Sequence, residues 1–365
     1  MVPTYGRGCV ADIVPALLGP SGTSALPPWL PAPVRDASHV VLLVIDGLGW
    51  QQMVARPHLT PNLSAMVGGA ITTVAPSTTA TALASITTGL TPGEHGVVGY
   101  RMQVRGEVLN VLRWWTEAGD ARKRIPARRL QPIPAFLGTS VPVVTKAEFA
   151  GSGFSDAHLA GTRLCGWRLP STLVVEVQQL VAAGESFVYA YYDGVDKVAH
   201  EYGLRAHYDA EVAAADELVG HLLAVLPDDA CLLVTADHGQ VHTGADVVHL
   251  HPDVGRLVAS QSGEGRFRWL HARAGAAADL LQAAEAAHGA QAWVVSTDHV
   301  IDEGWFGPRV ADVVRARLGD VALVARDDIT FDDPADTGII TLLARHGSVT
   351  EAEMYVPLVA ARGAR

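Results

Sequence analysis

Hydroxyl, carboxylate and imidazole side chains gather in a few short stretches of this sequence, where they could act together on a substrate. The stretch "TTVAPSTTATALASITTGL" begins at Thr72. Its Ser77, Thr78 and Thr79 precede a run of small residues that we expect to be helical. Such hydroxyls often cap a helix by accepting a backbone N–H, and an activated hydroxyl can also be a nucleophile. Taken alone, the stretch favours the cap.

Three carboxylates and three histidines stand at or beside the ends of apolar segments: Asp46, Asp196, His200, Asp237, His238 and His346. Asp196 and His200 are four positions apart, so on one helical turn both side chains would point the same way. Each residue alone also suits a turn, a helix start or a loop. Together they offer the oxygen and imidazole ligands that zinc accepts. Two metal ions about 4 Å apart can hold the attacking and leaving oxygens of a phosphoryl displacement, which gives the hydroxyl cluster a role.

The elements that must position these residues follow from the apolar pattern. Four segments have the composition of strands buried on both faces: residues 39–50, 141–145, 186–196 and 230–239. Residues 171–184 and 207–227 carry apolar side chains at three- and four-residue intervals, which is typical of helices. This alternation predicts an α/β fold, a doubly wound and mainly parallel sheet with helices on both faces. Ligands bind at the carboxyl ends of such strands, where the acids and histidines stand.

Differences in composition and apolar pattern divide the chain into three predicted parts. Residues 1–38 form an N-terminal lead-in that is rich in proline and small residues towards its end. Residues 39–251 and 329–365 form the α/β catalytic domain. Residues 252–328 have a different texture, and we expect them to form a small α+β insertion that caps the sheet.

Composition excludes several classes of partner. The formal net charge of −11 argues against binding a nucleic-acid polymer, which needs clustered cations. The one dense basic run, "ARKRIPARR" (Ala121–Arg129), is expected to be a solvated loop. Three widely spaced cysteines indicate neither a disulfide framework nor a cysteine zinc cluster, so a reducing, cytoplasmic location is predicted. No apolar run approaches the roughly 20 residues that span a bilayer, so no membrane partner is expected.

From Asp46 to Pro357 the chain resembles the alkaline phosphatase superfamily and, within it, the nucleotide pyrophosphatase/phosphodiesterase family. That family's nucleophile motif is a threonine followed nine residues later by Thr-Gly-Leu, and then by Pro and His-Gly. Thr79, Thr88–Leu90 and Pro92–Gly96 match it. The resemblance therefore selects Thr79 among the three clustered hydroxyls.

The resemblance implies a complete site with two Zn²⁺ ions. One ion would be held by Asp196, His200 and His346, and the other by Asp46, Asp237, His238 and the Thr79 oxygen. Thr79 would attack phosphorus to give a phospho-threonine, which water then hydrolyses. The implied activity is cleavage of phosphodiester or pyrophosphate bonds in a small phosphorylated substrate such as a nucleotide.

One departure from the family concerns the substrate side. The family carries an asparagine soon after His-Gly, whose amide contacts a phosphate oxygen, whereas this chain reads "HGVVGYRM". Tyr100 stands at that position with Arg101 beside it. A phenol donates one hydrogen bond and an arginine can donate two in a fork. We expect Tyr100 in the wall of the substrate pocket, while Arg101 suits a phosphate contact or a surface charge equally.

Alternatives remain on the same scaffold. A phosphomonoesterase, a phosphomutase or a non-catalytic metal-binding homologue would keep these ligands. A sulfatase is disfavoured because no cysteine stands in Cys/Ser-x-Pro-x-Arg, and a metal-free serine hydrolase because no Gly-x-Ser-x-Gly is present. The oligomeric state is left open.

Overall fold

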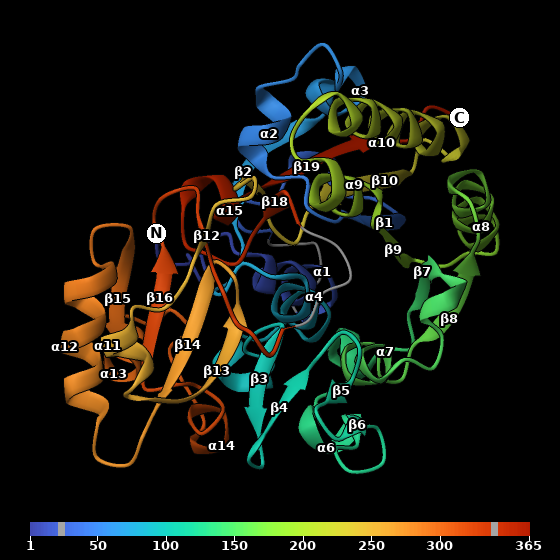
Figure 1. The fold of residues 1–365 in the computed structure, drawn as a ribbon. Coiled ribbons are helices and arrows are strands. Elements are labelled where there is room, and N and C mark those ends of the chain that lie inside the picture. The colour runs from blue at the N-terminus through green and yellow to red at the C-terminus, as the bar shows by residue number, and fades with distance from the viewer. Residues whose placement is uncertain (21–25, 337–341) are drawn as a thin grey trace.

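A seven-stranded sheet forms the centre of the computed structural model, which describes residues 1–20, 26–336 and 342–365 (Figure 1). Its order is β2-β19-β10-β1-β9-β7-β8. The strands are β1 (His39–Ile45), β2 (Val67–Thr72), β7 (Pro142–Lys146), β8 (Arg163–Trp167), β9 (Phe187–Tyr192), β10 (Ala230–Thr235) and β19 (Tyr355–Arg362). Only β19 runs antiparallel to its neighbours β10 and β2. The predicted mainly parallel α/β fold is confirmed.

The central strands are parallel because their residues are apolar on both faces. All six residues of β10 are buried, and so are six of the seven in β1. Their register pairs His39 with Ala230 and Val44 with Thr235. The predicted strand over 39–50 ends earlier, at Ile45, because Gly47 adopts a positive φ of 73° that turns the chain. The early end leaves Asp46 at the carboxyl edge of the sheet.

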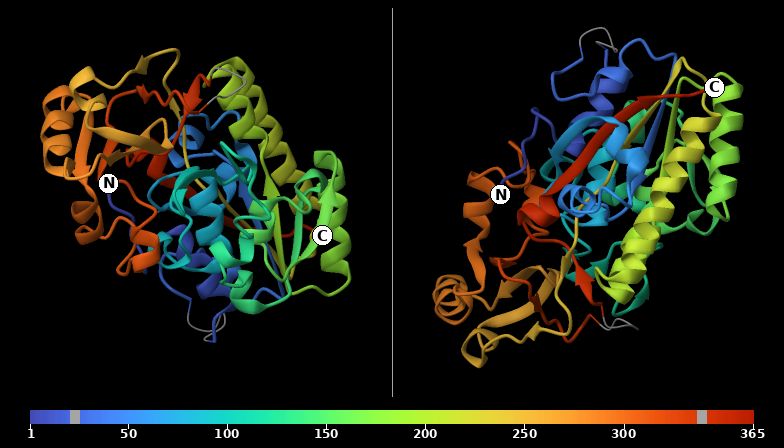
Figure 2. Two further views of the ribbon diagram at one scale, coloured as in Figure 1. Left: turned by 60° about the horizontal axis from the view of Figure 1, so that its bottom comes forward. Right: turned by 90° about the horizontal axis from the view of Figure 1, so that it is seen from above.

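Helices cover both faces of this sheet (Figure 2), with α8 and α10 on one side and α4 on the other. The longer helices are α4 (Thr79–Thr88), α8 (Pro170–Ala182), α9 (Gly194–Tyr202), α10 (Ala206–Val225) and α12 (Ala277–His288). The shorter ones are α1 (Ile13–Leu18), α2 (Trp50–Val54), α3 (Pro61–Ala65), α5 (Pro92–His95), α6 (Ala127–Leu130), α7 (Gly153–His158), α11 (Pro252–Gly255), α13 (Thr297–Asp302), α14 (Asp312–Arg315) and α15 (Glu351–Met354). No helix in the described ranges is both long and apolar enough to cross a bilayer.

A second sheet lies within the stretch expected to form the cap. It is antiparallel, in the order β13-β14-β16-β15. Its strands are β13 (Val258–Glu264), β14 (Phe267–Ala272), β15 (Ala292–Ser296) and β16 (Val321–Ala325). A separate hydrophobic cluster that includes Leu270, Leu280 and Leu323 packs between this sheet and α12. The division into lead-in, catalytic domain and insertion stays a prediction, and residues 21–25 and 337–341 of those parts lie outside the described residues.

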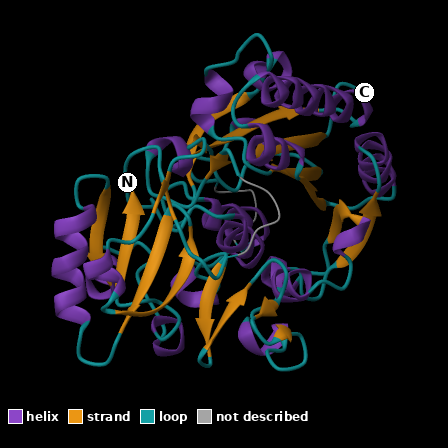
Figure 3. Cartoon of the chain, viewed as in Figure 1, coloured by secondary structure: helices purple, strands orange, loops and turns teal. Residues whose placement is uncertain are grey.

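Short strands that the sequence analysis did not anticipate form further sheets (Figure 3). A four-stranded sheet contains β3 (Arg101–Val104), β4 (Glu107–Asn110), β5 (Trp115–Thr116) and β6 (Gly119–Asp120). Two-stranded pairs join β11 (Val241–His242) with β18 (Ala344–Arg345), and β12 (Val247–Val248) with β17 (Thr330–Phe331). The first of these pairs places Ala344 and Arg345, which directly precede His346, beside the segment that follows β10.

A fully buried ion pair joins the second sheet to the last segment of the chain. Arg266 Nε and Nη2 donate to the two carboxylate oxygens of Glu353, at 2.7 and 2.9 Å. Both side chains have no exposed surface. Glu353 also accepts hydrogen bonds from the Ser348 N–H and the Thr350 hydroxyl. Glu353 therefore fixes the segment that follows His346 against the second sheet.

Replacing Glu353 by alanine should lower the free energy of unfolding by about 3–5 kcal/mol, because Arg266 would keep a buried charge without its carboxylate. Urea denaturation of the purified protein measures the change. Glu351→Ala, at an exposed position in α15, is the matched control and should cost less than ~0.5 kcal/mol. If both variants lost an equally small free energy of unfolding, the Arg266–Glu353 pair would not stabilise the fold.

Candidate active site

The predicted site residues come from separate elements that meet at the carboxyl edge of the sheet. Asp46 follows β1, and Asp237 and His238 follow β10. The loop after β9 leads directly into α9, which carries Asp196 and His200. His346 follows β18, and Thr79 is the first residue of α4.

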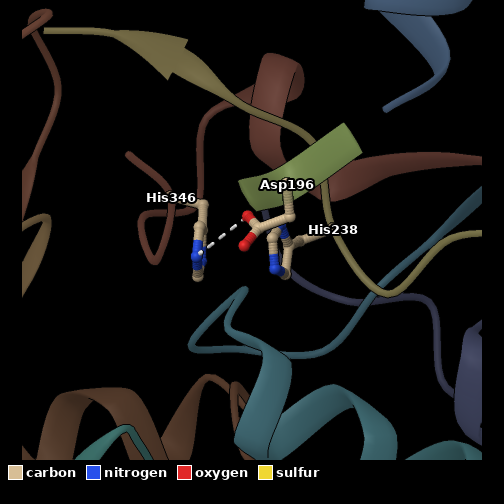
Figure 4. Close-up of side chains that lie close together, drawn as sticks. All are labelled: Asp196, His238 and His346. Carbon is tan, nitrogen blue, oxygen red and sulfur yellow. Dashed lines mark ion pairs between the residues drawn. The ribbon is translucent and has the colours of Figure 1, made fainter. Parts of the chain in front are cut away.

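The ligand atoms form two overlapping groups. Asp46, Asp237 and His238 make one group, and Asp196, His238 and His346 make the other; within each group the ligand atoms all lie within 4.8 Å of one another. His238 Nε2 is 3.3 Å from Asp46 Oδ1 and 3.6 Å from Asp237 Oδ2. Figure 4 shows Asp196, His238 and His346 close together, with His346 Nε2 at 3.8 Å from Asp196 Oδ1.

His200 lies at the margin of this cluster. Its Nε2 is 3.3 Å from Asp196 Oδ2, and its ring centroid is 5.2 Å from that of His346. His238, by contrast, stacks on His346 at 3.5 Å between ring centroids. The structure therefore brings all six predicted acids and histidines to one edge. His238 belongs to both groups and links them, whereas His200 belongs to neither.

Backbone carbonyls orient the three imidazoles. Nδ1 of His200 is 2.7 Å from the Ala344 carbonyl, and Nδ1 of His346 is 2.9 Å from the Ser77 carbonyl. Nδ1 of His238 is 3.1 Å from the Gly239 carbonyl. A carbonyl can only accept, so the neutral form of each ring places its proton on Nδ1 and leaves the lone pair on Nε2. That tautomer is the one in which Nε2 can bind a metal ion.

Two carboxylate oxygens of the ligand cluster have no hydrogen-bond donor although they are buried. They are Asp46 Oδ1 and Asp237 Oδ2, as counted over the described residues. Burial first, and then the charges of Asp237 and Asp196, raise the pKa of Asp46. Burial also raises the pKa of Asp237. Unpartnered buried oxygens beside free imidazole nitrogens are costly unless a cation compensates them, so this donor set fits a metal ion.

The three clustered hydroxyls have three different partners. Thr79 Oγ1 is 3.0 Å from His238 Nε2, inside the ligand cluster. The Ser77 hydroxyl donates to the Ser348 carbonyl at 2.6 Å. Thr78 is the N-cap residue of α4, yet its side chain makes no capping hydrogen bond; it lies near Glu264. Thr79 is thus the hydroxyl that faces the candidate metal ligands.

Tyr100 and Arg101 have different surroundings. The Tyr100 hydroxyl accepts a hydrogen bond of 2.6 Å from the Asn110 amide, and the side chain is half-buried. Arg101 is only 6% exposed. The alternative that it is a surface charge is therefore wrong. Its guanidinium pairs with Asp333, a carboxylate that Arg268 also contacts at 3.2 Å. At least one N–H group of Arg101 is therefore already bound within the protein.

Residues that the sequence analysis missed support the ligands from behind. The Tyr191 hydroxyl donates to Asp46, and the Gln240 amide donates to Asp196. Gly47 leaves room for Gln240 and Asp196. A Cβ at position 47 would meet Gln240 Nε2 at 2.8 Å and Asp196 Cβ at 2.9 Å. In the sequence, Gln240 stands only two residues after His238, and this short spacing was the signal that could have identified it. Tyr191 is hidden in an apolar strand.

Glu264, at the end of β13, was also missed. It is 6% exposed, and burial raises its pKa to about 8. Its Oε2 accepts the Tyr100 N–H at 2.9 Å, and a Cβ on Gly347 would meet its Cγ at 2.6 Å. The second sheet thus places a carboxyl group against the turns that carry Thr79 and His346. No sequence spacing pointed to this contact.

The sequence model of the type I phosphodiesterase/nucleotide pyrophosphatase family matches residues 40–177 and 168–349. A search of curated proteins gives no match. Murine ectonucleotide pyrophosphatase/phosphodiesterase 5 has a similar structure, with a TM-score of 0.64, 16% identity, and coverage of 88% of this chain and 87% of that chain. An inactive threonine-to-alanine variant of that protein was solved in complex with AMP.

A second similar structure is phosphonoacetate hydrolase from Sinorhizobium meliloti 1021, solved in complex with phosphonoacetate. Its TM-score is 0.65 and its identity 16%, with coverage of 90% of this chain and 91% of that chain. At such low identity these likenesses concern the fold, whereas the family match spans most of the sequence. The chain therefore belongs to the type I phosphodiesterase/nucleotide pyrophosphatase family, and is a hydrolase of the alkaline phosphatase superfamily.

Proposed function

We propose that this protein cleaves phosphodiester or pyrophosphate bonds in a small phosphorylated substrate such as a nucleotide, with Thr79 as the nucleophile at a two-zinc site. The observation that carries the proposal is the position of the Thr79 hydroxyl, 3.0 Å from His238 Nε2, which in turn faces the unpartnered oxygens of Asp46 and Asp237. A similar structure, inactive with threonine replaced by alanine and bound to AMP, supports both the nucleophile and the substrate class.

The family is metal-dependent, and the proposed ligand sets use the residues of both groups together with His200, which lies beside Asp196. Asp196, His200 and His346 would hold one ion, and Asp46, Asp237, His238 and the Thr79 oxygen the other. Three imidazoles favour zinc over magnesium, which prefers oxygen ligands. The chemistry that the two ions supply when bound is charge neutralisation at the phosphoryl group and a lower pKa for the Thr79 hydroxyl.

The chain's own groups complete the reaction. As Thr79 Oγ gives up its proton to solvent and forms its bond to phosphorus, the bond from phosphorus to the leaving oxygen breaks, and that oxygen takes a proton from solvent. Water then attacks the phospho-threonine, releases the phosphoryl product and restores the hydroxyl. The first turn of α4 presents backbone N–H groups that the Thr78 side chain does not cap. Such N–H groups stabilise negative charge on phosphoryl oxygens.

The substrate side is proposed to include Tyr100 and Arg101. Tyr100 stands where the family's phosphate-contacting asparagine would, and we assign it to the wall beside the ester group. Arg101 has its guanidinium against Asp333, so we give it a positioning part, holding the start of β3 next to Tyr100. The three cysteines form no disulfide, which supports a reducing cytoplasm as the proposed location.

Thr79→Ala should lower kcat by at least about 10³-fold, because it removes the group that forms the covalent intermediate. Metal content per chain, measured by elemental analysis, should stay close to that of the wild type, since six other ligands remain. Thr78→Ala is the matched control and should lose less than about tenfold. A dead Thr78→Ala beside an active Thr79→Ala would show that the nucleophile is misassigned.

The proposed diesterase activity predicts a preference between two aryl substrates. The ratio of kcat/KM for an aryl phosphodiester over the matching monoester should exceed about tenfold, because the phenol of Tyr100 supplies a wall for the second ester group rather than an extra cation for a dianion. Tyr100→Phe, which removes only the hydroxyl, should change the ratio less than Tyr100→Ala. A wild-type preference for the monoester would make this protein a phosphomonoesterase.

A further inference from the structure

A cavity of about 270 Å³ lies outside the ligand cluster and shares no residue with it. It is bounded by β3 and the residues just after it, by residues 125–130, and by α14 with the residues that follow (Figure 1). Three arginines line it, Arg105, Arg129 and Arg317, and no acidic side chain does. In a chain whose net charge is −11, this concentration of cations is unexpected.

Arg317 is buried and pairs with no carboxylate among the residues that the structure describes. It is 8% exposed, and its guanidinium donates to the carbonyls of Gly96 and Leu130, the latter at 3.1 Å. Burial lowers its pKa to about 10. These two carbonyls accept hydrogen bonds from it but carry no full negative charge to offset its own. A bound anion would supply that compensation.

Arg129 belongs to the basic run "ARKRIPARR", which the proposed function leaves unexplained. Two arginines of that run have acidic partners, since Arg122 pairs with Asp120 and Arg124 pairs with Glu107. Arg129 and Arg105 are exposed and pair with no carboxylate within the described ranges of the chain. Their guanidinium groups are therefore available to a ligand.

Apart from Gln103, the remaining walls of the cavity are apolar, and they include Val104, Ile125, Leu130 and Val313. Ligand sites commonly combine apolar walls with a few charged groups that fix orientation. Guanidinium forks match the geometry of phosphoryl oxygens. We propose that this cavity, which we call the arginine cavity, binds a small molecule that carries a phosphoryl group on an apolar or planar body, at a site separate from the catalytic one.

Calorimetric titration of the metal-loaded enzyme with phenylphosphonate tests this site, because the probe has a phosphoryl group, an apolar ring and no ester bond. The double variant Arg105→Gln/Arg129→Gln should lose one binding equivalent per chain relative to the wild type, or bind it at least about tenfold more weakly. Its kcat and KM for an aryl diester should stay within about twofold of the wild type, since neither arginine touches the ligand cluster.

Lys123→Gln/Arg128→Gln is the matched control. It removes the same charge from exposed positions of the same basic run that do not line the arginine cavity, and it should keep the full number of equivalents. Loss of the same equivalent in both double variants, or in neither, would overturn the site. Inorganic phosphate should bind this site more weakly than phenylphosphonate; equal affinity would overturn the assignment of an apolar body to the ligand.

Discussion

Electrostatic repulsion among buried carboxylates is the constraint on which this structure depends. Asp46 and Asp237 are almost wholly buried, and Asp196 lies close enough that its charge raises the pKa of both. Three negative charges in a dry edge of a sheet destabilise the fold unless cations compensate them. The three imidazoles turn their Nε2 atoms towards the same space. Metal ions held there, as we propose, would offset this repulsion and would also supply the reactivity of the site.

Much of the remaining architecture keeps the last ligand in place. His346 comes late in the chain, and the Ser77 carbonyl orients its ring just before the nucleophile helix begins. The segment after His346 is fixed by Glu353, which Arg266 of the second sheet holds through a buried ion pair. Glu264 of that sheet meets the Tyr100 N–H. The second sheet therefore contacts both the segment that follows His346 and the backbone of Tyr100.

The parts of this account that the sequence could predict are those with local causes. Continuous apolar runs indicated β1, β9 and β10, and short spacings placed Asp196 with His200 and Asp237 with His238. Contacts between distant segments had no such signal. Arg101 pairs with Asp333 across 232 positions, and Tyr191 reaches Asp46 from within an apolar strand. The sheet of β3–β6 was missed because its strands have only two to four residues, too few to show a period.

The central claim is the proposal that the ligand cluster holds two zinc ions. Anomalous diffraction from crystals of the zinc-loaded protein, recorded above and below the zinc absorption edge, tests it most directly. The account predicts two zinc peaks. One should lie among Asp196, His200 and His346, and the other beside Asp46, Asp237, His238 and the Thr79 oxygen. A single peak shared by both groups, or zinc bound away from Thr79, would contradict it.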